Sequence, residues 1–365
     1  MFIDQQAFAK DEDDNDSNND DEDDNDSKNN DDEDDNDSKN NDDEDDNDSK
    51  NNDDEDDNDS KNNDDEDEKE DAIDTDKNIP ITSSYSKNDK FGIEKIYPTK
   101  TGGEEWFMNM NNINDDKQFF PFGESDSKYS NSNLQITKND DLSWKIKSDN
   151  KLAKVRMNVY TSEGYHPEGI KTLDHSELED TGYMQSEKDW KNIEITGYVK
   201  LNHNNIPLNE GRFTWYNRGG HHTEGEPCEG VAYKGDIFFS GDNRFAKEQW
   251  HVSYFFTDIK KNLNHIKDKW IGYKFIVYNL EKQSGTSETV VKMESWIDYN
   301  NDGKWIKLNE YTDKGKWGDS GKKCDGKKDQ IISWGGPIAT FRWDQADDVD
   351  FKNFSVREIQ SPINS

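Results

Sequence analysis

Cysteine is scarce in this sequence: the 365 residues contain two, Cys228 and Cys324. That number excludes the small secreted folds held by several disulfides, and the absence of a CxxC spacing removes the common zinc and redox motifs. The two cysteines either form one disulfide in an oxidising compartment or remain free thiols. Long apolar runs are also missing. No stretch approaches the ~18 residues of a membrane helix, so no membrane span is predicted.

Aromatic residues and glycine are absent from an acidic segment near the N-terminus. Between Asp11 and Glu70 stand 35 acidic residues and five lysines, and the 11-residue unit DEDDNDSKNND, first seen at Asp21, recurs with little change. Such a segment buries too little surface to offset the entropy of ordering, so residues 11–76 are predicted to be a disordered tail. We interpret the tail as an extended spacer that binds divalent cations weakly and without specificity.

The composition divides the remaining chain into three parts. Residues 1–10 contain an Ala-x-Ala pattern at positions 7–9. We interpret them as the remnant of a signal peptide, with a short cytosolic N-terminus as the alternative. Residues 77–90 are a polar linker, and residues 91–365 are predicted to form one folded domain. The signal-peptide interpretation predicts an extracellular or cell-surface protein. The net charge of -37 argues against nucleic acid as a partner.

The folded part shows short segments rich in β-branched and aromatic residues, many with period-2 alternation, and almost no helical periodicity. Many strands at regular spacing predict an all-β sandwich or jelly roll. The predicted strands are Lys154–Ser162, Asn192–His203, Arg212–Arg218, Val231–Phe239, Gln249–Thr257, Trp270–Leu280, Val290–Tyr299, Lys304–Thr312, Ile338–Asp344 and Val349–Ile359.

Five of these segments carry a resemblance to a known superfamily. They read EITGYVKLN at 194–202, RFAKEQWHVSYFF at 244–256, KWIGYKFIVYN at 269–279, VKMESWIDYNNDGKWIKL at 291–308 and DFKNFSVREI at 350–359. Together they resemble the concanavalin A-like jelly-roll superfamily of lectins, glucanases and polysaccharide lyases. The resemblance implies a concanavalin A-like jelly-roll β-sandwich that handles carbohydrate.

Two shorter motifs resemble the alginate-lyase-like family (polysaccharide lyase family 7) within that superfamily. Gln249-Trp250-His251 is similar to its Gln-x-His motif, and the strand from Lys274 to Asn279 is similar to its Lys-Ala-Gly-x-Tyr-x-Gln strand. β-Elimination on a uronate needs a group that neutralises the carboxylate, a base and an acid. The resemblance implies these roles for a catalytic set comprising Gln249, His251, Lys274, Tyr278 and Arg218.

Aromatic and cationic residues are the candidates for carbohydrate binding, because aromatic rings stack on the apolar faces of sugars and polar side chains orient the hydroxyls. The sugar-binding candidates are Trp215, His222, Arg244, Lys247, Trp250, Trp334 and Arg342.

Metal and hydrolase chemistry have weaker signals. Asp298, Asn300 and Asp302 match the first half of a calcium loop, so a structural calcium is one interpretation and a simple hairpin turn is the other. His221 and His222 suggest zinc, or a loop at a ligand-facing edge. Glu294 and Asp298 share one strand face, as the two carboxylates of a glycosidase would.

Two classes of function therefore remain. The first is a secreted carbohydrate-binding jelly roll whose partner is an extracellular polysaccharide. The second is an enzyme of the same fold, a polysaccharide lyase or, with less support, a glycoside hydrolase. A matrix or mineral-associated protein that acts through its acidic tail is a third interpretation. No cofactor other than the structural calcium is expected.

Overall fold

The structure is a computed structural model that describes residues 86–362, apart from gaps at 117, 124–133, 150–153, 167–173, 221–227, 229, 250–252, 262, 281–288 and 319–325. The chain divides into two units, Met1–Asn78 and Ile79–Ser365, and every described residue belongs to the second. The acidic tail lies outside the described residues. Among those described, no helix has the length and hydropathy of a membrane span.

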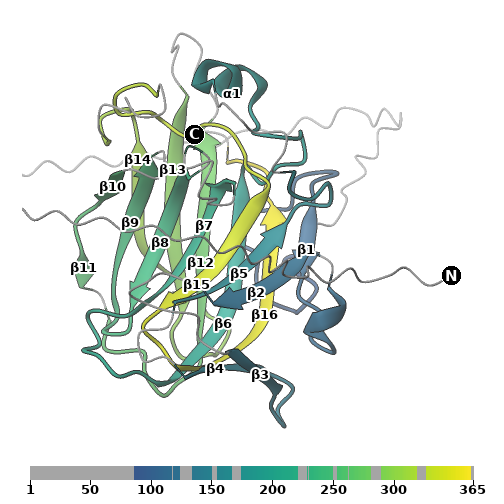
Figure 1. Cartoon of the computed structure of the whole chain (residues 1–365), viewed down its shortest axis with the longest axis vertical. Helices are drawn as coiled ribbons and strands as arrows, with labels where there is room; N and C mark the ends of the chain where they lie inside the picture. The colour runs from purple at the N-terminus through teal and green to yellow at the C-terminus, as the bar shows by residue number, and fades with distance from the viewer. Residues whose placement is uncertain are drawn as a thin grey trace, which may run out of the picture. The chain divides into compact units, whose positions relative to one another are not determined.

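Two antiparallel sheets form the described unit, and their strands run side by side in Figure 1. One, called here the β6 sheet, has the order β14-β13-β12-β6-β16-β4-β3, with β1 also paired to β16. Its strands are β14 (Ile306–Asp313), β13 (Val290–Asp298), β12 (Ile271–Leu280), β6 (Ile193–His203), β16 (Asp348–Glu358), β4 (Trp144–Ser148), β3 (Leu134–Lys138) and β1 (Glu105–Phe107).

The second sheet, called the β7 sheet, has the order β10-β9-β8-β7-β15-β5-β2, with β11 also paired to β9. Its strands are β10 (Ser253–Phe256), β9 (Asp242–Gln249), β8 (Ala232–Phe238), β7 (Arg212–Gly219), β15 (Ile338–Asp344), β5 (Lys154–Tyr160), β2 (Phe119–Gly123) and β11 (Lys260–Lys261). The described helices are a 3-10 turn, η1 (Ile113–Asp115), and α1 (His175–Thr181). This architecture confirms the predicted all-β jelly-roll sandwich.

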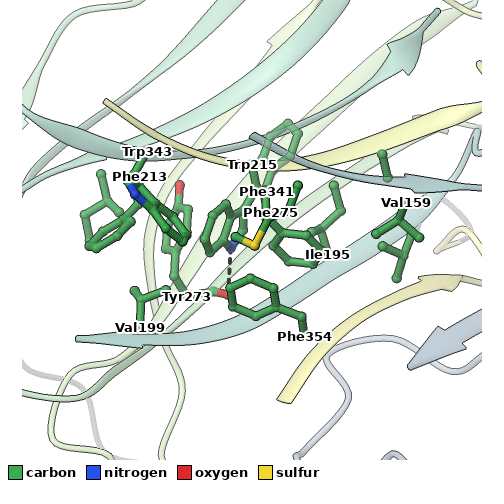
Figure 2. Packing of buried hydrophobic residues seen from close by; sticks show 14 of the residues in the cluster. Val159, Ile195, Val199, Phe213, Trp215, Tyr273, Phe275, Phe341, Trp343 and Phe354 are labelled. Atoms are coloured by element: carbon green, nitrogen blue, oxygen red, sulfur yellow. Dashed lines mark hydrogen bonds between the residues drawn. The ribbon is translucent and has the colours of Figure 1, made fainter. Parts of the chain in front are cut away.

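An aromatic core joins the two sheets. Alternate residues of each strand point between the sheets, and Trp215 of β7 lies there with its ring 4.9 Å from that of Phe341 on β15 and 5.6 Å from that of Phe354 on β16. The indole of Trp215 also donates a hydrogen bond to the carbonyl of Tyr273 on β12 (3.2 Å), so it bridges both layers (Figure 2). The sheets are therefore held by interleaved rings, each burying a large apolar area.

Glycines on the inner faces make room for these rings. A Cβ at Gly235 of β8 would lie 2.6 Å from the ring of Phe275, and one at Gly197 of β6 would lie 2.6 Å from the ring of Phe354. Because real Cβ atoms do not approach so closely, neither position accepts a side chain unless the ring moves. The close approach of strand backbone to an aromatic ring is why glycine stands inside two otherwise β-branched and aromatic segments.

A segment that ends in β1 covers part of the outer face of the β6 sheet. Residues 86–107, called here the strap, cross β6, β12 and β13 and then pair as β1 with β16. The backbone N–H of Ile96 donates to Glu194 of β6 (3.1 Å), and the hydroxyl of Tyr97 donates to Glu294 of β13 (2.9 Å). The core covers one face of β12 and the strap covers the other, which explains why residues on both faces of this strand are buried.

Cys228 is disulfide-bonded. The chain has one other cysteine, Cys324, which lies outside the described residues. Of the two interpretations of the cysteines, a disulfide or free thiols, the structure therefore contains the disulfide.

The central position of Phe341 leads to a stability prediction. Phe341→Ala removes a fully buried ring that stacks 4.2 Å from Phe354, and we expect the free energy of unfolding to fall by about 3 to 5 kcal/mol because a cavity remains. Urea denaturation followed by tryptophan fluorescence measures the loss. Ile306→Ala, at a position 59% exposed on β14, is the control and should change stability by less than about 0.5 kcal/mol. Equal losses in the two variants would contradict this account of the core.

Candidate functional site

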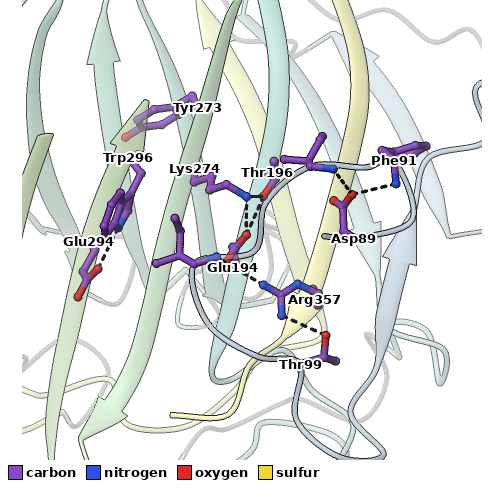
Figure 3. A network of polar contacts seen from close by, with 12 residues as sticks. Asp89, Phe91, Thr99, Glu194, Thr196, Tyr273, Lys274, Glu294, Trp296 and Arg357 are labelled. Carbon is purple, nitrogen blue, oxygen red and sulfur yellow. Dashed lines mark hydrogen bonds and ion pairs between the residues drawn. The ribbon is translucent and has the colours of Figure 1, made fainter. Parts of the chain in front are cut away.

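Lys274 and Tyr278 lie on the outer face of the β6 sheet, as alternation along β12 requires, but the strap covers them. The ammonium of Lys274 contacts Glu194 on the neighbouring strand at 2.5 Å and donates to Thr196 at 3.0 Å (Figure 3). Arg357 of β16 contacts the other oxygen of Glu194 at 2.8 Å. Lys274, Glu194 and Arg357 are all buried, so they form a closed ionic cluster and not a ligand surface.

The electrostatics of this cluster fit a structural role. Burial would raise the pKa of Glu194, but Lys274, Arg357 and the hydrogen bond from Ile96 outweigh it and hold the pKa below its usual value. Burial lowers the pKa of Lys274, and Glu194 acts against that shift. A buried carboxylate with two cations is costly to expose or to break, because removing one partner leaves an uncompensated charge.

Glu294, the hydrolase candidate, is also beneath the strap. It is fully buried and accepts hydrogen bonds from Tyr97 (2.9 Å), Tyr278 (3.1 Å) and Trp296 (2.9 Å). Burial raises the pKa of Tyr278 far above its usual value, so its hydroxyl stays a donor to Glu294. The face that Glu294 shares with Asp298 on β13 is therefore not open to a sugar chain.

Gln249 and Arg218 belong to the other sheet, which corrects the predicted lyase set. Gln249 ends β9 on the inner side, fully buried, where its amide donates to the carbonyl of Lys327 (3.2 Å). Arg218 is fully buried at the end of β7. Lys274 and Tyr278 lie on the outer face of the β6 sheet, so these four residues do not converge on one groove. Sequence alternation fixed which residues share a face of one strand but not which sheet each strand joins.

Three of the sugar-binding candidates are core residues instead. Trp215 and Trp334 are fully buried. Lys247 points between the sheets, where its ammonium contacts Asp313 (2.8 Å) and the carbonyl of Trp317 (2.7 Å). These positions correct the prediction, since none of the three side chains can meet a ligand without unfolding.

The calcium candidates form a hairpin turn between β13 and β14. Asp298 accepts hydrogen bonds from the backbone N–H groups of Asp302 and Gly303, both at 2.9 Å, and from the hydroxyl of Tyr198. Gly303 has φ +80°, as such a turn requires. In the part of the chain that the structure describes, no group of three His, Cys, Asp or Glu could hold a metal ion. The hairpin interpretation accounts for Asp298, Asn300 and Asp302 without calcium.

Three predicted residues lie outside the described residues: His222, Trp250 and His251. The same holds for His221. Their roles in sugar binding, zinc binding or proton transfer remain predictions.

The face of the β7 sheet that points away from the β6 sheet carries a cleft of about 400 Å³. Six strands, β5, β7, β8, β9, β10 and β15, contribute to its floor and walls. The side chains that line it are Lys154, Arg212, Thr214, Lys234, Asp236, Ala246, Tyr254, Phe256, Arg342, Asp344 and Gln345. Arg342 was a sugar-binding candidate, and Arg244, another, lies beside the cleft.

Ion pairs between neighbouring strands organise the cleft floor. Asp344 contacts Arg342 at 2.6 Å and Arg212 at 3.1 Å, and Asp236 contacts Arg244 at 3.1 Å. Burial would raise the pKa of Asp344, but Arg342 and Arg212 hold it below its usual value. Asp344 therefore stays ionised and, together with Asp236, fixes the guanidinium groups, so planar donors are held in place before a ligand arrives.

Aromatic rings form one wall of the cleft. Tyr254 and Phe256 of β10 are each 47% exposed. The guanidinium of Arg244 lies 3.8 Å from the ring centre of Phe256, and the ammonium of Lys234 lies 4.9 Å from that of Tyr254. The Tyr254 hydroxyl donates to Glu248 (2.7 Å). The rings are thus fixed by cations and a hydrogen bond while an apolar surface stays exposed.

The sequence analysis did not select most of these residues. Arg212, Asp236, Asp344 and Phe256 stand on four strands whose order in the sheet no local pattern reveals. The one available signal was alternation: Arg342 and Asp344 share a face of β15, and Arg212 and Thr214 share a face of β7.

Comparisons with known proteins concern the fold. No family model and no curated protein matches the sequence. Similar solved structures include a Bacillus subtilis protein of unknown function with a galectin-like fold (13% identity, TM-score 0.38, covering 73% of this chain and 100% of that one). Others are the Ca²⁺-bound exoplasmic/lumenal domain of VIP36 (8%, 0.38, 69% and 87%) and the alginate lyase vAL-1 from Chlorella virus (10%, 0.32, 62% and 89%). Such low identities and TM-scores carry no ligand or reaction over to this chain.

The buried cluster beneath the strap leads to a pH-dependent prediction. Lys274→Met leaves Glu194 with one cation, and we expect the free energy of unfolding at pH 7 to fall by about 3 to 5 kcal/mol. Because the pKa of Glu194 is depressed in the folded state, its stabilising contribution is present above its unfolded pKa of ~4.3 and is lost as the pH falls. The difference between wild type and variant should therefore narrow from pH 7 to pH 3.

Urea denaturation at both pH values measures this difference. Lys304→Met is the control, because the Lys304 side chain is 83% exposed and its ion pair with Asp302 lies at the surface. A loss that is the same at pH 7 and pH 3 would show that Glu194 is not the group on which Lys274 acts.

Proposed function

We propose that the cleft on the β7 sheet binds a polysaccharide that carries acidic groups. One observation carries the proposal: exposed Tyr254 and Phe256 rings stand beside a row of guanidinium groups held in place by buried carboxylates. Sugars present both apolar faces and hydroxyl groups, so a binding surface needs rings and oriented polar groups together.

The charge of the cleft favours an acidic polymer over a neutral one. Among the described side chains that line it, four are cationic and two are anionic, Asp236 and Asp344. Guanidinium groups recognise carboxylate and sulfate through paired N–H donors. Most of the net charge of -37 lies in the acidic segment between Asp11 and Glu70, whereas the cleft floor carries an excess of positive charge. A uronate or a sulfated sugar therefore gains attraction in the cleft that a neutral glucan lacks.

Binding without catalysis is the function that these residues support best. A glycosidase needs a carboxylic acid with a raised pKa as proton donor, whereas the pKa of Asp344 is lowered by Arg342 and Arg212. The lyase alternative depends on His251, which lies outside the described residues, and its other members are divided between two sheets. The binding proposal needs no residue beyond those of the cleft.

We also infer that the protein works outside the cytoplasm. The disulfide at Cys228 supports this location, because disulfides persist mainly in oxidising compartments. The acidic tail then acts as a spacer between the binding domain and whatever holds its N-terminal end, and it binds divalent cations weakly.

Retention of the full chain in gels that contain a polymer tests the proposal. A uronate polymer and a sulfated galactan should each slow the protein, and a neutral glucan should do so much less. Retention by the acidic polymers should weaken between 50 and 500 mM salt, values chosen to span the range where ionic contacts are screened. Ultraviolet absorbance of the same mixtures should stay constant. New absorbance from unsaturated ends would replace binding with the lyase alternative, and equal retention by the neutral glucan would remove the acidic preference.

Two variants separate the contributions of ring and charge. Phe256→Ala and Arg212→Gln should each lower the affinity for the acidic polymer about tenfold, which corresponds to about 1.4 kcal/mol. Only Arg212→Gln should reduce the salt dependence. Ile306→Ala, an exposed apolar residue on the other sheet, is the matched control and should bind within about twofold of wild type. Unchanged affinity in both cleft variants would place the binding site elsewhere.

A further inference from the structure

We propose that a second, separate pocket at one end of the β6 sheet binds an oxyanion group: a carboxylate, sulfate or phosphate. The pocket, called here the Lys191 pocket, has a volume of about 270 Å³. It forms where β6 begins and where β12 and β16 end, and it shares no lining residue with the cleft of the β7 sheet. Its lining residues are Lys100, Lys191, Asn192, Asn279, Leu280, Ile359, Gln360 and Ser361.

Lys191 is the first reason. It lies half-buried in the turn before β6, and within the described part of the chain no carboxylate approaches its ammonium to ion-pair distance. Burial and the neighbouring charges of Arg218 and Lys100 lower the pKa of Lys191. A partly desolvated cation next to two other cations is unfavourable unless an anion joins them.

Arg218 is the second reason. It is fully buried, and its guanidinium donates to neutral acceptors: the carbonyls of Ile332 (2.6 Å) and Lys191 (3.1 Å) and the side chain of Asn192 (3.4 Å). Burial lowers its pKa to about 10. The ring centre of Tyr233 lies 5.8 Å from the guanidinium, and among the described residues no carboxylate pairs with it. Buried cations in proteins are normally paired, so within the described part of the chain this guanidinium is an unbalanced positive charge.

The backbone holds Arg218 in this place at a cost. Arg218 has φ +77°, in the left-handed region that non-glycine residues avoid, and the pairing of β15 with β7 shifts register at this point. Such strain persists where the surrounding structure fixes it, and it concentrates at ligand sites. In a regular strand the side chain of Arg218 would point to the outer face of the β7 sheet. The strained turn instead directs its guanidinium inward, behind Lys191 and Asn192.

The charge balance identifies the ligand class. Lys100, Lys191 and Arg218 contribute three positive charges, and Glu358, which contacts Lys100 at 3.2 Å, contributes one negative charge. An oxyanion in the pocket would meet the ammonium groups of Lys191 and Lys100 and the polar side chains of Gln360 and Ser361. It would offset the remaining charge that the described residues leave uncompensated, and an uncharged ligand would not.

Thermal unfolding of the full chain with sodium phosphate or sodium sulfate tests the pocket. At 1 to 20 mM anion, with chloride used to keep the ionic strength constant, we expect the Tm of wild type to rise by about 3 °C in a saturable manner. Lys191→Met should lose this rise. Lys188→Met is the matched control, because Lys188 is an exposed lysine paired with Glu163, and it should keep the full rise. Equal shifts in wild type and Lys191→Met would overturn the proposal, since they would reflect general salt effects.

A second variant covers the case in which Lys191→Met does not fold. Lys191→Arg keeps the charge, so its Kd for phosphate, measured by titration calorimetry, should stay within about threefold of that of wild type. If wild type itself gives no heat on titration with phosphate, the proposal is overturned. Thermal unfolding with an acidic oligosaccharide in place of phosphate identifies the source of the anion. A Lys191-dependent shift with the oligosaccharide assigns the pocket to a charged group of the polymer, and a shift with phosphate alone assigns it to a free ion. The cleft variant Arg212→Gln should leave either shift unchanged, so this result is independent of the cleft.

Discussion

The strap decides which side of this sandwich a ligand can reach. In a sheet that packs on one core face, the other face is open by default, and the β7 sheet follows this rule. The β6 sheet does not, because Ile96 and Tyr97 bring a backbone donor and a phenol to Glu194 and Glu294. These donors add to the partners that Glu194 and Glu294 already have on their own sheet. Once they are covered, the ionic cluster of Lys274 becomes structural, and the polar outer face of the β7 sheet remains open for the polymer that we propose it binds.

The two polar faces illustrate how the same residue types serve different purposes. Around Glu194, two cations meet one carboxylate in a dry interior, so the interaction is strong, directional and closed. Around Asp236 and Asp344, arginines from the same strand and from neighbouring strands meet carboxylates near the surface, and aromatic rings lie alongside. The ionic cluster around Glu194 resists exchange with a ligand. The arrangement around Asp236 and Asp344 instead presents guanidinium groups and ring faces at the cleft.

Local pattern was sufficient for the fold and insufficient for the site. Each of the ten predicted strands overlaps a strand of the structure, because β-branched and aromatic alternation is a local property. Strand β9 was missed apart from its last residue, Gln249, since DNRFAKEQ has low strand propensity and an inward-facing lysine, Lys247, that pairs with Asp313. The shared face of Lys274 and Tyr278 was predicted correctly. That the strap would cover it depends on the contact between Tyr97 and Tyr278, which are 181 positions apart, and no periodicity encodes such a contact.

The connection of the strap to β16 has a consequence for how this chain reaches its final form. Thr99 and Arg357 are hydrogen-bonded across 258 residues, so during synthesis the strap leaves the ribosome long before its partner strand exists. Until β16 arrives, Glu194 and Lys274 remain hydrated on an unfinished sheet. Closure of the strap is therefore a late event with a large entropy of loop closure. A chain interrupted before β16 would expose the ionic cluster and an unpaired edge of β6, which makes the nascent protein a natural client for chaperones.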